Sequence, residues 1–124
     1  MPKFDRLLWK AFLRASNAKN ADVLIRRIAK ALEKEVSVVD LRPYRKDKTL
    51  FEASFTTPLG MTEVQDALFE SLRLADKLSP AWEVRPPQQY EGGKWDFAGS
   101  SDRKLTISGV VRLEFEAANT PTPA

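Results

Sequence analysis

Apolar and polar residues alternate almost without exception from Leu105 to Glu116. One set of alternate positions is apolar or glycine: Leu105, Ile107, Gly109, Val111, Leu113 and Phe115. The other set is mostly polar: Thr106, Ser108, Val110, Arg112, Glu114 and Glu116. A period of two residues is that of a β-strand, whose successive side chains point to opposite faces of a sheet. The pattern predicts a strand with one buried and one solvent-facing side, which is typical of an antiparallel sheet.

Four shorter segments are also predicted as strands: residues 36–42, 50–57, 81–85 and 95–97. The first two have β-branched residues or alternating apolar residues, and a charged turn at 44–48 joins them, so they form a predicted hairpin. The last two are separated by a predicted loop, residues 86–93. This loop begins with two prolines and ends with two glycines, both of which favour turns over regular structure.

Three segments have the apolar spacing of amphipathic helices: residues 4–15, 20–34 and 62–78. In the first, Trp9 falls off the centre of the apolar stripe. The second has Asn20 as its predicted N-cap. The third begins with Thr62 and Gln65, whose spacing is that of a capping box.

These elements predict a single α+β domain over residues 1–117, followed by a flexible C-terminal tail at 118–124. The predicted element order is ααββαβββ. Because the connections are short, neighbouring strands should be antiparallel. We expect a mostly antiparallel, twisted sheet with the helices packed on one face.

The chain contains no cysteine and no histidine. This excludes disulfides, thiolate nucleophiles and Cys-type or His-type metal ligation, and it removes the commonest general base. A hard-cation site built from carboxylates and acid–base chemistry by Lys or Tyr stay open, but no motif for either is present. We therefore expect a protein that is not an enzyme, with no catalytic residues, no metal site and no cofactor. The lack of cysteine also fits a reducing compartment, so the expected localisation is cytoplasmic. No apolar run approaches the roughly 20 residues of a membrane span.

Charge is distributed unevenly along the sequence. Residues 1–48 carry 13 Lys/Arg and 6 Asp/Glu, a net charge of +7, whereas residues 49–124 carry 7 and 11, a net charge of −4. A basic segment of this kind is typical of proteins with an acidic partner. No recognised nucleic-acid-binding motif accompanies it, and solvated helix faces would produce the same pattern.

Possible catalytic or nucleotide-binding patterns have simpler interpretations. Glu114 and Glu116 lie two residues apart on the polar face of the last predicted strand, where solvated carboxylates are expected. The glycines at 92–93 and 99 lie in predicted strand-to-strand turns. A phosphate-binding loop instead runs from a strand into a helix.

A predicted protein-binding site lies in the loop after residue 84. Tyr90 is an aromatic residue outside any core pattern, and aromatic and arginine residues are frequent energetic anchors at interfaces. The other candidate partner-binding residues of this loop are Arg85, Gln88, Gln89, Glu91 and Lys94. The 44–48 turn adds Tyr44, Arg45, Lys46 and Lys48, on the expectation that both turns lie at the same end of the sheet.

Three segments together resemble a known family: residues 82–84 (WEV), 93–97 (GKWDF) and 107–116 (ISGVVRLEFE). With the preceding helix, residues 50–117 resemble the C-terminal halves of small immunity proteins from bacterial contact-dependent inhibition and type VI secretion systems. The resemblance implies a non-enzymatic protein that binds and neutralises a cognate toxin. The alternative is a nucleic-acid-binding or regulatory adaptor protein that uses the basic N-terminal segment. The oligomeric state remains open.

Overall fold

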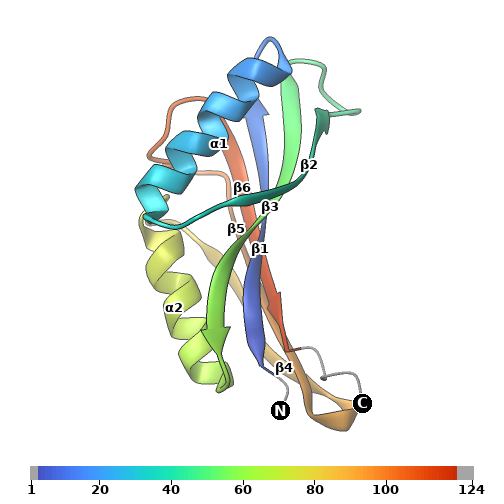
Figure 1. Cartoon of the computed structure of the whole chain (residues 1–124), viewed down its shortest axis with the longest axis vertical. Helices are drawn as coiled ribbons and strands as arrows, with labels where there is room; N and C mark the ends of the chain where they lie inside the picture. Colours follow the sequence, from blue (N-terminus) through green and yellow to red (C-terminus); the bar gives the residue numbers. More distant parts are fainter. Residues whose placement is uncertain (1–2, 120–124) are drawn as a thin grey trace.

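The computed structural model describes residues 3–119 (Figure 1). In this part of the chain, six strands form one antiparallel sheet, accompanied by two α-helices and a short 3₁₀ turn. The strands are β1 (Phe4–Arg14), β2 (Ser37–Pro43), β3 (Leu50–Met61), β4 (Glu83–Tyr90), β5 (Lys94–Ser101) and β6 (Val110–Ala118). The helices are α1 (Ala18–Leu32) and α2 (Val64–Asp76), and the turn is η1 (Glu91–Gly93). The α+β class and the antiparallel pairing are as predicted.

The prediction of a helix over residues 4–15 is wrong, because this segment is the strand β1. Its fully buried side chains include a set at alternate positions: Leu7, Trp9, Ala11 and Leu13. Trp9, which the helical pattern placed off the centre of the apolar stripe, lies in the core, where its Nε1 donates a hydrogen bond to Thr57 Oγ1 at 3.0 Å. Pairing with a strand on each side outweighs the local helical preference. The element order is therefore βαββαβββ rather than ααββαβββ.

The strands are arranged in the order β2-β3-β1-β6-β5-β4. β1 is central, with β3 on one side and β6 on the other, so Trp9 pairs with both Phe55 and Phe115. The β2–β3 hairpin forms one edge of the sheet, and the β4–β5 hairpin forms the other. Figure 1 shows these two hairpins extending toward opposite ends of the molecule.

The helices begin at different residues from those predicted. Asn17, not Asn20, is the N-cap of α1, and its side chain accepts a hydrogen bond from the Asn20 backbone N–H at 2.8 Å. α2 begins after Glu63 without a side-chain cap, so the capping box expected from Thr62 and Gln65 is not formed.

The helices contact the sheet in different places. α1 contacts β1 and β2, whereas α2 contacts β3 and β1. The expected layer of helices packed on one face of the sheet is not clearly formed, and this part of the prediction is corrected. With residues 4–15 in the sheet, two helices are present in the described chain instead of the predicted three.

Aromatic rings fill the centre of the core. The ring of Trp9 is stacked on Phe55 with centroids 6.3 Å apart, and it meets Phe115 edge-on at 5.9 Å. Phe115 in turn contacts Trp82 at 5.3 Å and Phe97 at 6.4 Å. These rings come from five separate segments, so the cluster joins the strands of both halves of the sheet to the segment that leads into β4.

The last strand differs from its prediction in its start and its end. β6 begins at Val110, not at Leu105, and Val110 is buried instead of facing solvent because the β1–β6 register shifts beside it. Leu113 and Phe115 are buried, as the alternation predicts. The tail predicted at 118–124 begins inside β6, and Asn119 is also buried. Residues 120–124 lie outside the described part of the chain.

Within residues 3–119, neither helix is long and apolar enough to cross a membrane.

Candidate functional site

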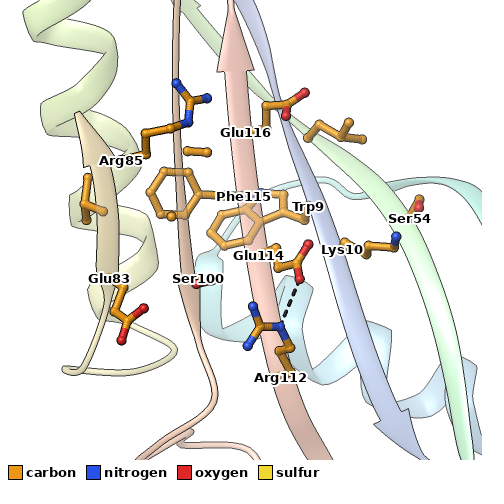
Figure 2. A pocket seen from close by; sticks show the side chains of 14 residues that line it. Trp9, Lys10, Ser54, Glu83, Arg85, Ser100, Arg112, Glu114, Phe115 and Glu116 are labelled. Atoms are coloured by element: carbon orange, nitrogen blue, oxygen red, sulfur yellow. Dashed lines mark hydrogen bonds and ion pairs between the residues drawn. The ribbon is translucent and has the colours of Figure 1, made fainter. Parts of the chain in front are cut away.

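A groove of about 710 Å³ lies on the side of the sheet opposite the aromatic core. We call this side the open face. On the central strands it carries Leu8, Lys10, Ala98, Ser100, Glu114 and Glu116. Figure 2 shows Glu83 and Arg85 of β4 on one side of the groove and Lys10 and Ser54 on the other, with the glutamates of β6 between them.

The groove exists because β5 carries small side chains on the open face. Ala98 and Ser100 lie between long charged residues of β4 and β6, their partners in the sheet. Neighbouring strands are about 4.8 Å apart, so the β4 and β6 backbones that flank β5 are separated by roughly 10 Å. This width accommodates one extended polypeptide segment or one long side chain.

The floor of the groove is supported from behind by the core. Gly99 of β5 pairs with Phe115 of β6, and the Phe115 ring lies against Gly99 on the core side. A Cβ atom at position 99 would lie only 2.6 Å from Phe115 Cζ. Because Gly99 has no side chain, the Phe115 ring packs directly against the backbone that forms the groove floor. This tight contact holds this part of the sheet in place.

Ion pairs organise one side of the groove around Glu52 of β3. Its carboxylate lies 3.0 Å from Lys10 Nζ and 3.6 Å from the Arg42 guanidinium. The hydrogen bond from Lys10, with a further contribution from Arg42, lowers the pKa of Glu52 below its ordinary value of 4.5. Glu52 is therefore held as a carboxylate, and Lys10 is held against β3.

The remaining cations of the groove are also paired. Arg112 lies 2.9 Å from Glu114 and 3.8 Å from Asp102. Arg85 lies 2.8 Å from Asp96, and this hydrogen bond raises the pKa of the Arg85 guanidinium above its ordinary value. These contacts fix the positions of both guanidinium groups.

The structure brings the 85–94 part of the predicted site together at the edge of the groove. The one hydroxyl hydrogen of Tyr90 has two acceptors within reach of Oη, Gln88 Oε1 at 3.0 Å and Asp96 Oδ1 at 3.2 Å, and Arg85 donates to the same Asp96 oxygen. Among the predicted site residues, only Arg85 lines the groove itself. The remaining members of the segment continue along the same hairpin: Gln89 on β4, Glu91 in η1 and Lys94 on β5.

The 44–48 turn is not brought to this site. It joins β2 to β3 at the opposite edge of the sheet and at the opposite end of the strands. Tyr44 packs its ring against Phe12, with centroids 4.9 Å apart, so it is a packing residue and not an open tip. The turn also contains three exposed cations: Arg45, Lys46 and Lys48. The sheet order therefore separates the two turns that the sequence prediction combined.

Several groove residues were missed by the sequence prediction. Lys10 was assigned to a helix, and Glu114 and Glu116 were interpreted only as solvated side chains. The small run Ala98-Gly99-Ser100 within a strand was the available signal, because small residues between bulky neighbours leave a hollow on a sheet. This run predicts a groove only when β5 is known to lie between β4 and β6.

Within residues 3–119, no group of three or more His, Cys, Asp or Glu side chains is arranged to hold a metal ion. Comparison with known proteins found no matching family model, no matching curated protein and no matching solved structure.

Proposed function

We propose that this domain is a non-enzymatic protein-binding module that receives a segment of its partner in the groove of the open face. The observation that carries the proposal is the hollow over Ala98 and Ser100, which lies between charged walls and is supported by the core. A volume of about 710 Å³ is within the range of known ligand sites. A preformed site also avoids much of the ordering cost of association.

The resemblance of residues 50–117 to immunity proteins suggests the partner, a cognate bacterial toxin. An immunity protein requires a stable scaffold and one surface that blocks its toxin, and it requires no catalytic group. The groove and the adjoining Arg85–Tyr90 edge together supply such a surface. Tyr90 is 45% exposed and is held by its hydrogen bonds, so it would contact a partner with little further loss of side-chain freedom.

The alternative role, nucleic-acid or adaptor binding by the basic N-terminal segment, has less geometric support. Part of this segment, Phe4–Arg14, forms the central strand β1, and several of its cations are already paired, including Lys10 with Glu52 and Arg26 with Asp22. A saturable, salt-sensitive gel shift with DNA or RNA near physiological salt would favour this alternative.

Filling the groove tests the proposal. Ser100→Tyr places a large side chain over the hollow while retaining high strand propensity. The partner to test is the protein encoded next to this chain's gene, and the assay is titration calorimetry. We expect binding to weaken more than about thirtyfold, which corresponds to about 2 kcal/mol.

The matched control is Ser37→Tyr, which makes the same chemical change on the edge strand β2, outside the groove. It should bind with wild-type affinity. Circular dichroism melts should show that both variants are folded. Undiminished binding by a folded Ser100→Tyr variant would exclude the groove as the binding site.

A further inference from the structure

The charges of the groove are not equally available to a partner. Each cation that lines it is already within ion-pair distance of a carboxylate of the same domain: Lys10 with Glu52, Arg85 with Asp96, and Arg112 with Glu114 and Asp102. By contrast, Glu83 and Glu116 are exposed and have no ion-pair partner within residues 3–119. The groove residues whose charge is not neutralised by an ion pair within the domain are therefore negatively charged.

The local balance of charge has the same sign. The charged groove residues and the side chains ion-paired with them comprise three cations and six carboxylates, a net charge of −3. The chain as a whole has a net charge of +3. The groove is thus an acidic site on a basic protein, and its charge would attract a basic segment.

The positions of the two unpaired carboxylates indicate how such a segment would lie. Glu83 is on β4 and Glu116 is on β6, so they flank the small residues of β5 from its two sides. Glu83 is paired with Ser100 and Glu116 with Ala98, so the two carboxylates lie diagonally across β5, and Figure 2 shows Glu116 at the level of Arg85 and Glu83 near Ser100. A Lys or Arg side chain between them would place its aliphatic stem over Ala98 and its charged end near the carboxylates.

We infer that the groove binds an extended, basic segment of the partner protein, with a lysine or arginine side chain held between Glu83 and Glu116. This inference rests on the proposed function, because it names the chemistry of the segment that the groove receives. An anionic segment would have to face these two carboxylates, and Arg85, the cation on the other side of Ala98 from Glu116, is already paired with Asp96. Covering the two carboxylates with an anionic segment would cost desolvation free energy, and no attraction between opposite charges would offset it.

The probes are two fluorescein-labelled eight-residue peptides, one alternating Arg and Thr and the other alternating Glu and Thr. Fluorescence polarisation is measured at 50 mM and 300 mM NaCl. We expect saturable binding of the arginine peptide only, and we expect its affinity to fall at the higher salt concentration because charge pairs on an accessible surface are screened. Binding of the glutamate peptide, or of neither peptide, would overturn the inference.

A double variant and its matched control test whether Glu83 and Glu116 are the residues that bind the arginine peptide. Glu83→Gln combined with Glu116→Gln should weaken arginine-peptide binding at least tenfold, with an unchanged melting temperature. The matched control combines Glu35→Gln with Glu63→Gln, which removes the same charge from two exposed residues outside the groove. Equal effects of the two double variants would indicate general charge attraction and would contradict a specific site.

Failure of this inference can be distinguished from failure of the proposed function. If Ser100→Tyr abolishes partner binding but the Glu83/Glu116 double variant does not affect it, the groove is the site and its occupant is not basic. If Ser100→Tyr leaves partner binding intact, the groove itself is excluded.

Discussion

The two faces of the central strands differ in almost every physical property, although they share one backbone. On β1, Trp9 is fully buried among aromatic rings, whereas its neighbour Leu8 is 42% exposed on the open face. On β6, Phe115 contacts three rings of the core, whereas Glu114 on the other side is ion-paired with Arg112. The comparison indicates that substitutions on the core face should affect stability, and that those on the open face should affect binding with little cost in stability.

The largest effect is expected for Trp9→Ala, which should reduce the free energy of unfolding by about 3–5 kcal/mol. The ring contacts Phe55 and Phe115, and its loss would also leave the buried Thr57 hydroxyl without its hydrogen-bond donor. Leu8→Ala, one residue earlier on the open face, should cost under about 1 kcal/mol. Urea unfolding of both variants measures the difference. Similar losses would mean that the two faces are not distinct.

A smaller effect is expected for Gly99→Ala, about 1–3 kcal/mol, because the added methyl group would overlap the Phe115 ring, which is buried and packed against Trp9, Trp82 and Phe97. The adjacent Ala98→Ser adds an atom on the open face and should cost under about 0.5 kcal/mol. Thermal melts compare the two variants. Gly99→Ala with unchanged stability would show that the contact between the floor and the core is loose.

The smallest effect is expected on the open face itself, from Glu52→Gln. Because Lys10 lowers the pKa of Glu52 in the folded state, the ionised carboxylate stabilises the fold above the ordinary value of 4.5. This contribution disappears as the pH falls through the lowered folded value. The variant should therefore be less stable than the wild type by about 1 kcal/mol at pH 7, and the two should converge at strongly acidic pH.

Urea unfolding at pH 7 and at pH 3 measures this difference, with Glu63→Gln as the control at an exposed carboxylate. A difference that is the same at both pH values would mean that the ion pair contributes nothing and that the substitution acts through packing.

Most elements after residue 16 were predictable from local sequence patterns. The strand before it, β1, was not. Its apolar residues satisfy the spacing of a helix and of a strand at once. The decisive residue was Trp9, because this large aromatic side chain lies off the centre of the helical stripe but fits the alternation of a strand. Local patterns cannot resolve this ambiguity, since the strand is stabilised by β3 and β6, which lie far away in the sequence.

The edge strand β4 was only partly predictable for a different reason. Pro86 and Pro87 favour a loop because proline cannot donate to a ladder of hydrogen bonds. In the structure they lie in an outer strand, at the irregularity in its pairing with β5, where proline is tolerated. The predicted long loop is therefore mostly strand, and the turn itself is the short η1 (Glu91–Gly93). The groove could not be predicted, because its walls become neighbours only through the sheet order.

The central position of β1 also has a consequence for how the domain folds. Trp9, from the first strand, reaches its full set of partners only after Phe115, from the last strand, is in place. Most contacts join segments that are far apart in the sequence. Domains dominated by such contacts fold in milliseconds to seconds, because the entropy of bringing distant segments together is lost before their contacts contribute favourable free energy. During synthesis, the apolar side of β1 emerges from the ribosome well before β6 can cover it. Until then, one of its two hydrogen-bonding edges remains unpaired, and the nascent chain is most exposed to aggregation during this interval.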